Sequence, residues 1–119
     1  MENLRFLSED QVRRLQAEFG TPLFVYDQAS LERQAAVALG FPAPFGLTVR
    51  YAMKACPSAA VLRVLTEAGL HIDASSGWEV HRAIAAGVPA KRILLTAQQL
   101  PEDLAELIGL GTGFNACSL

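Results

Sequence analysis

Short apolar runs alternate with longer amphipathic segments over the second half of the chain. Four of these runs predict strands, and they span residues 47–55, 71–75, 92–97 and 114–118. The segments between them carry apolar residues at helical spacing and predict helices over residues 58–68, 76–86 and 101–108. Strands that alternate with helices of this length indicate βα units on a parallel sheet.

The N-terminal region follows a less regular pattern. Ser8 and Gln11 have the spacing of a capping box and predict a helix that ends at Gly20. Residues 22–27 are rich in β-branched and aromatic side chains and predict a short strand. A second helix is expected over residues 30–39.

A loop rich in glycine and proline, residues 40–46, separates this region from the βα rhythm. We therefore divide the chain into residues 1–46, which lead into the sheet, and residues 47–119, which form it. A parallel sheet is either open and doubly wound or closed into a (β/α)8 barrel. No dinucleotide fingerprint or P-loop follows a predicted strand. Four units make half a barrel, so we expect a barrel that is incomplete in this chain.

Composition narrows the class of partners. The 119 residues are 51% hydrophobic and 18% charged, which argues against disorder, and the net charge is −2. The ten basic residues are scattered, so we expect neither nucleic acid nor membrane as a partner. No apolar run approaches the roughly 20 residues that span a bilayer, and no signal-peptide pattern is present. Cys56 and Cys117 lack zinc-like spacing and predict reduced thiols in a cytoplasmic protein.

One lysine interrupts the first apolar run of the regular region, in the sequence Tyr-Ala-Met-Lys-Ala of residues 51–55. Within a strand covered on both faces, Lys54 would lose most of its hydration, which favours a neutral amine. A neutral, desolvated lysine amine is the form that bonds to carbonyl compounds. The alternative is a lysine at the exposed end of the strand that simply reaches water.

The next predicted strand carries an acid toward the same end of the sheet. His71, Asp73 and Ser75 alternate with apolar residues, so these polar side chains share one face. Lys54 and Asp73 are therefore expected together at the carboxyl ends of adjacent strands, where parallel α/β proteins form their sites. Asp73 is either a solvated acid at a strand end or a partner that sets the charge of Lys54.

The remaining polar and aromatic residues have local explanations. Ser76 and Glu79 again have capping-box spacing. Trp78 is expected to pack, His81 to lie on the surface, and Cys56 to be an inert thiol. No group of residues has metal-ligand spacing, so no metal is expected.

Three segments, in this order, resemble the N-terminal half of the fold-type III pyridoxal-phosphate-dependent decarboxylases. They are residues 20–27 (GTPLFVYD), 51–55 (YAMKA) and 73–79 (DASSGWE). These segments are most similar to those of diaminopimelate decarboxylases, and ornithine and arginine decarboxylases are more distant. It runs from about Gly20 to the end of the chain.

The resemblance implies an alanine-racemase-like barrel, a separate C-terminal β-domain that is absent from these 119 residues, and a homodimer. Lys54 falls on the lysine that forms the internal aldimine with pyridoxal 5′-phosphate. Asp73 falls on an acid near that lysine, Ala52 on a small residue beside the cofactor ring, and Glu79 on a glutamate near the active site. The relatives commonly have asparagine at the position of Cys56 and glycine at that of Trp78.

The implied activity is that of a lyase, the decarboxylation of a diaminopimelate-like or other basic or dicarboxylic amino acid. The family's glycine-rich phosphate loop and its other cofactor contacts come later than residue 119, so we expect the 119 residues alone to be inactive. Two alternatives stay open. One is an amino-acid racemase or pyridoxal-phosphate-binding protein on the same barrel, and the other is a non-catalytic association module.

Overall fold

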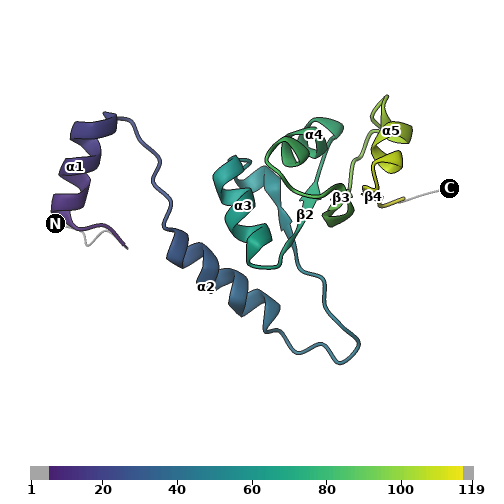
Figure 1. The fold of residues 1–119 in the computed structure, drawn as a ribbon, viewed down its shortest axis with the longest axis horizontal. Coiled ribbons are helices and arrows are strands. Elements are labelled where there is room, and N and C mark those ends of the chain that lie inside the picture. Colours follow the sequence, from purple (N-terminus) through teal and green to yellow (C-terminus); the bar gives the residue numbers. More distant parts are fainter. Residues whose placement is uncertain (1–5, 117–119) are drawn as a thin grey trace.

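Four parallel strands form the centre of the computed structural model, which describes residues 6–116 (Figure 1). They are β1 (Arg50–Ala52), β2 (His71–Ala74), β3 (Ile93–Leu95) and β4 (Gly113–Phe114). The strands lie in the order β1-β2-β3-β4, and each pairs in parallel with the next. A sheet that keeps chain order, with no reversal, follows the path of a barrel wall rather than a doubly wound sheet. The partial barrel expected from the sequence is confirmed.

The helices of the βα units are α3 (Ala59–Glu67), α4 (Gly77–Ala85) and α5 (Leu104–Gly109). They differ from the predicted helices only at their ends. β2 ends within one residue of its prediction, whereas β1 and β3 are much shorter than predicted and β4 begins one residue earlier. The end of the predicted fourth strand, with Cys117, lies outside the described residues.

One face of the sheet is buried beneath the helices. Ile72, Ala74 and Leu95 are fully buried there, against Leu62 of α3 and Val80 of α4. The opposite face carries Asp73 and Leu94, which are only half-buried. The alternation of polar and apolar positions therefore assigns the two faces as predicted.

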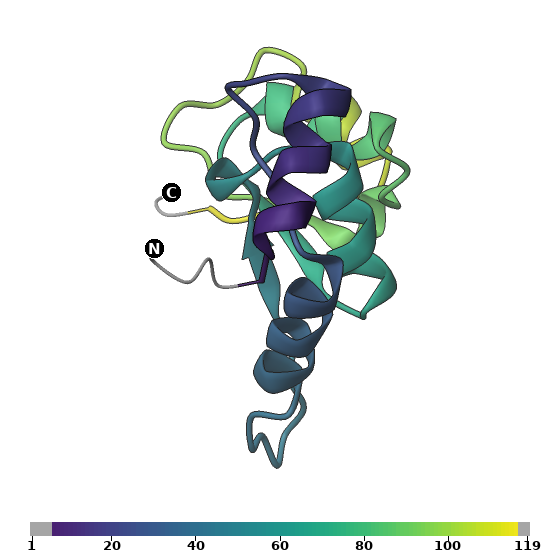
Figure 2. The ribbon, with the colours of Figure 1, turned by 90° about the vertical axis from the view of Figure 1, so that its left-hand side faces the viewer.

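A second core joins α2 (Gln28–Leu39) to α3. Ala35 of α2 packs with Val61, Leu65 and Leu70, all buried. Beyond α2, residues 40–46 form a loop that extends away from the sheet (Figure 2). Among residues 6–116, no helix has the length and apolarity needed to cross a membrane.

Helix α1 (Glu9–Phe19) stands apart from the other elements (Figure 1). Its capping box is confirmed, since the Ser8 amide donates to Gln11 Oε1 at 2.8 Å and the Gln11 amide to Ser8 Oγ at 3.3 Å. No residue of α1 is buried. The radius of gyration is accordingly 17.3 Å, against about 13.5 Å for a compact domain of this length.

The strand predicted over residues 22–27 is wrong for the described chain. This segment links α1 to α2 and pairs with no strand of the described four-stranded sheet. High β-propensity describes side chains that suit a sheet, and it does not supply the neighbouring strand.

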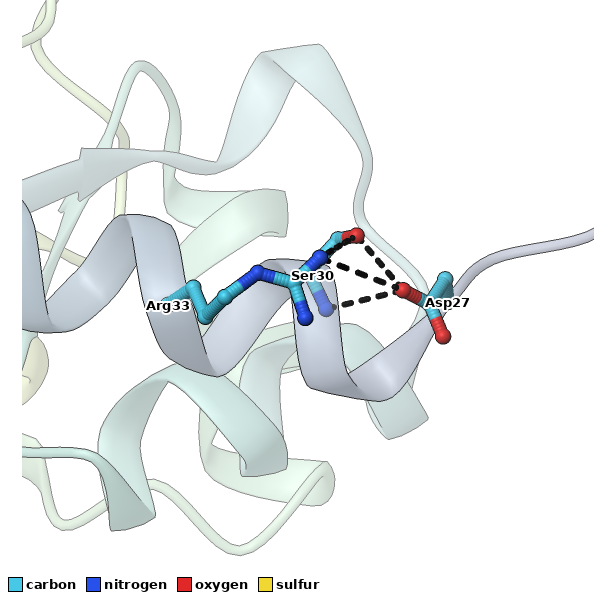
Figure 3. A network of polar contacts seen from close by, with 3 residues as sticks. All are labelled: Asp27, Ser30 and Arg33. Carbon is cyan, nitrogen blue, oxygen red and sulfur yellow. Dashed lines mark hydrogen bonds and ion pairs between the residues drawn. The ribbon is translucent and has the colours of Figure 1, made fainter. Parts of the chain in front are cut away.

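The N-terminus of α2 is held by three polar side chains (Figure 3). The Ser30 amide donates to Asp27 Oδ2 at 3.0 Å, and an Arg33 nitrogen lies 3.8 Å from the same oxygen. The side-chain hydrogen bond from Ser30 lowers the pKa of Asp27 below its ordinary value, and the charge of Arg33 acts in the same direction. Asp27 is therefore a charged N-cap that fixes where α2 begins.

Replacing the N-cap should loosen the start of α2. Because Asp27→Ala removes the acceptor for the Ser30 amide, we expect about fivefold faster amide exchange in the first turn of α2. In the unaltered chain the cap contributes fully above the ordinary aspartate pKa and is lost as the pH falls through the lowered value. The matched control, Asp27→Asn, keeps a capping oxygen without a titrating group. Slow exchange in Asp27→Ala at neutral pH would contradict the assigned cap.

The turn after β1 is anchored by Met53, which has no exposed surface and belongs to the main core. Met53→Ala should lower the free energy of unfolding by about 3 kcal/mol because it leaves a cavity. Met53→Leu, which keeps the volume, should cost less than about 1.5 kcal/mol. Urea denaturation of the two variants checks this, and equal midpoints would show that the turn does not depend on Met53.

Candidate active site

Lys54 lies on a short helical turn directly after β1. The turn, η1 (Met53–Ala55), begins where the backbone leaves the strand at Ala52. Met53 is fully buried beneath the turn while Lys54 is exposed. The predicted strand over residues 47–55 therefore ends too late, and of the two possibilities for Lys54 the described chain shows the lysine that reaches water. The turn buries the thioether and leaves the amine in water, which avoids the cost of burying a charge.

Asp73 lies on β2, next to the end of β1. Its register partner on β1 is Ala52, the last residue before the turn that carries Lys54. Asp73 is half-buried and accepts a hydrogen bond from Thr96 Oγ1 at 2.8 Å. Thr96 directly follows β3, and its amide donates to the Ala74 carbonyl at 2.8 Å. Three consecutive strands thus direct a lysine, a carboxylate and a hydroxyl to one end of the sheet.

These three residues line one open cleft of about 1030 Å³. Its walls come from the turn after β1, the first turns of α4 and the loop between β3 and α5. The full lining consists of Lys54, Asp73, Ser75, Ser76, Gly77, Trp78, His81, Thr96, Gln98, Gln99, Leu100, Pro101, Glu102 and Asp103. Lys54 and Asp73 therefore share a cleft at the carboxyl ends of adjacent strands, as the sequence predicted.

The start of α4 is capped by its own side chains. The Glu79 amide donates to Ser76 Oγ at 3.2 Å, as the predicted capping box requires. The Glu79 carboxylate instead accepts from the amide of Ser75, at 2.6 Å. Glu79 does not line the cleft, and neither does Ala52, although Ala52 lies beside Asp73 in the sheet.

A contact between α4 and the β3–α5 loop forms the outer wall. His81 Nε2 lies 2.6 Å from Asp103 Oδ2. Gly77 is buried, and a Cβ added there would come within 3.0 Å of Pro101 Cβ, so only glycine allows this approach without a shift. No local spacing pattern predicts the contact between His81 and Asp103, because the two residues are 22 positions apart.

Trp78 does not pack as expected. It is 86% exposed and lines the cleft, because the first turn of α4 directs its neighbour Gly77 inward against Pro101. The prediction of a packing tryptophan is therefore wrong.

Cys56 lies two residues beyond Lys54 and is half-buried as a free thiol. Tyr51 Oη donates to the Cys56 carbonyl at 3.4 Å, and burial raises the pKa of Tyr51 above its ordinary value. A hydrogen bond with Cys56 is the main cause that raises the pKa of Tyr26. Cys56 thus brings the segment before α2 close to the turn that carries Lys54.

The other end of the same sheet face carries His71. Burial lowers the pKa of His71 below its ordinary value of 6.5, and the charges of Arg50 and Arg92 add to the effect. The neutral ring is favoured there. Among residues 6–116, no three histidine, cysteine or acidic side chains lie together as metal ligands.

Comparison with known proteins shows the family to which this chain belongs. Residues 28–117 match a family described as "Pyridoxal-dependent decarboxylase, pyridoxal binding domain". The chain is 38% identical over 107 residues to diaminopimelate decarboxylase of Streptomyces coelicolor, across 86% of this chain and 23% of that protein. It is 41% identical over 81 residues to diaminopimelate decarboxylase of Escherichia coli strain K12, across 68% of this chain and 18% of that protein. The chain thus spans about a fifth of the length of these relatives.

Solved structures share the fold. Lysine/ornithine decarboxylase from Vibrio vulnificus, in complex with putrescine, superposes with a TM-score of 0.74 at 28% identity, over 91% of this chain and 31% of that chain. Diaminopimelate decarboxylase from Helicobacter pylori, in complex with L-lysine, gives a TM-score of 0.73 at 22% identity, over 87% of this chain and 27% of that chain.

The cofactor of the matched family is pyridoxal phosphate. The family match covers the elements that carry Lys54, Asp73 and Thr96, and the solved decarboxylase from Vibrio vulnificus shares the fold of these elements. The chain belongs to the family of pyridoxal-dependent decarboxylases, through their pyridoxal-binding domain.

Proposed function

We propose that this chain forms the lysine-bearing part of a pyridoxal-phosphate site in an amino-acid decarboxylase, with Lys54 as the residue that holds the cofactor. The observation that carries the proposal is the position of Lys54. Its amine is exposed in the cleft that Asp73 also lines, at the carboxyl ends of adjacent parallel strands.

The chemistry of the cleft fits the cofactor. Pyridoxal phosphate carries an aldehyde, and Lys54 is the only lysine among the cleft residues. The cleft volume of about 1030 Å³ leaves room for the cofactor and an amino acid together. When bound, pyridoxal phosphate supplies an electron sink for the negative charge left by departing CO2.

The residues of this chain have separate roles in the proposal. Lys54 would hold the cofactor by condensation of its unprotonated amine with the aldehyde, with the aldehyde oxygen leaving as water, and its Nζ would carry a proton once the amine is released. The Asp73 carboxylate would place a negative charge in the cleft that Lys54 also lines. From the family resemblance we propose Ala52, the register partner of Asp73, beside the cofactor ring and Glu79, which caps α4, near the active site, although neither lines the cleft in the described chain.

The substrate we propose is a diaminopimelate-like or another basic or dicarboxylic amino acid. The names of the matched relatives support this class, since they are diaminopimelate decarboxylases and a lysine/ornithine decarboxylase. No observation on the described residues favours racemisation or a purely structural role over decarboxylation.

The 119 residues alone are proposed to be inactive. In the described chain the polar face of the sheet is uncovered and Lys54 is in water, whereas catalytic electrostatics are strongest where water is excluded. We propose that residues 47–119 form the first half of the cofactor-binding barrel and residues 1–46 lead into it. A homodimer and a cytoplasmic location remain predictions from the sequence.

The two lysines of the chain provide a direct test of the attachment site. Lys54→Ala should abolish the visible absorbance that a lysine-bound cofactor gives when pyridoxal phosphate is added to the protein that carries this chain. Lys91→Ala is the matched control, because Lys91 lies on the turn before β3, at the opposite end of the sheet. Full absorbance in Lys54→Ala, or its loss in Lys91→Ala alone, would contradict the proposal.

The reaction is tested separately by incubating the same protein with pyridoxal phosphate and candidate amino acids. Release of CO2 is the expected result. Inversion of chirality without release of CO2 would show that the activity is that of a racemase and not of a decarboxylase. The isolated 119 residues should release none, because the proposal requires the polar face to be covered.

A further inference from the structure

We infer that Thr96 is a positioning residue, which holds the Asp73 carboxylate in one orientation toward the cofactor side of the cleft. This inference rests on the proposed function and extends it to a residue with no direct part in the chemistry.

The Thr96 hydroxyl donates to the Asp73 carboxylate rather than to the nearby backbone carbonyl. Thr96 Oγ1 lies 2.8 Å from Asp73 Oδ1 and 3.4 Å from the Ala74 carbonyl oxygen. A hydroxyl has one hydrogen to donate, and the shorter distance lies at the optimum for an O–H donor. The Asp73 carboxylate is therefore the main acceptor of the Thr96 hydroxyl.

The sheet fixes the donor before any ligand binds. Asp73 pairs with Leu94 in the register of β2 and β3, and Thr96 follows Leu94 by two residues, on the same face. The Thr96 amide is bonded to the Ala74 carbonyl at 2.8 Å, which fixes the backbone of Thr96. A β-branched side chain has few rotamers, so the hydroxyl keeps its direction.

The hydrogen bond engages only one oxygen of the carboxylate. Asp73 Oδ2 makes no hydrogen bond within residues 6–116, while Asp73 lines the cleft together with Lys54. With Oδ1 occupied by Thr96, the carboxylate cannot rotate freely, and Oδ2 remains available to a group bound in the cleft. Hydrogen bonds to a charged acceptor are the stronger class, so this restraint is substantial.

A double-mutant cycle tests this inference. The measured quantity is the affinity for pyridoxal phosphate, in the protein that carries this chain. Thr96→Val removes the hydroxyl at nearly constant volume and should weaken binding about tenfold, as expected for a lost hydrogen bond to a charged group. Thr96→Ser restores the hydroxyl and should recover most of the affinity. In an Asp73→Ala background, Thr96→Val should change the affinity less than about twofold, because the two residues act as a unit.

A second readout needs no cofactor. In the cofactor-free protein, the carboxyl carbon resonance of Asp73 should shift in Thr96→Val and return toward its original position in Thr96→Ser. Circular dichroism of each variant separates loss of the hydrogen bond from loss of the fold.

Equal weakening by Thr96→Val with and without Asp73, or no weakening at all, would overturn the inference. These results differ from those that defeat the proposed function, in which Lys54→Ala keeps the full cofactor absorbance. If Lys54→Ala loses the absorbance while Thr96→Val binds normally, the function stands and only the role of Thr96 falls.

Discussion

The parallel register of β1, β2 and β3 is the constraint on which the site depends. Parallel pairing sends every strand in the same direction, so the residues that end successive strands meet at one edge of the sheet. Ala52 is paired with Asp73, and Asp73 with Leu94, so the turn with Lys54 and the hydroxyl of Thr96 both lie beside the same carboxylate. A shift of one residue in either pair would turn Asp73 toward the helices.

Packing on the other face holds that register. Met53, Ile72 and Leu95 are fully buried beneath the helices, and moving any of them to the polar face would expose large apolar surface. The turn after β1 shows the link between core and site, because Met53 is buried and its neighbour Lys54 is exposed. The polar contacts of the cleft then refine an arrangement that apolar burial has already selected.

Much of the fold follows from short-range patterns. The capping residues, the glycines after helices and the βα rhythm predicted α1 to α4 and the order of the sheet, because each signal acts within a few residues. The strand predicted over residues 22–27 failed because a strand requires a neighbour, which local propensity does not report. Lys54 was predicted within the first strand because the apolar run continues past Ala52, whereas the turn that carries it depends on how Met53 packs.

The site was only partly predictable for a related reason. Alternation along a strand assigns Asp73 to a face, and parallel topology brings it near Lys54. The contacts of Thr96 with Asp73 and of His81 with Asp103 join residues 23 and 22 positions apart, and no local pattern marks them. Trp78 was misjudged because its exposure depends on the approach of Pro101 to Gly77.

Lys54 is proposed as the amine that holds pyridoxal phosphate. Borohydride reduction of the protein with bound cofactor, followed by trypsin digestion and mass spectrometry, identifies the amine directly, because reduction leaves a stable pyridoxyl group on it. We expect the added mass on the peptide of residues 51–63, uncleaved after Lys54. The added mass on Lys91 instead, or on no residue within this chain, would contradict it.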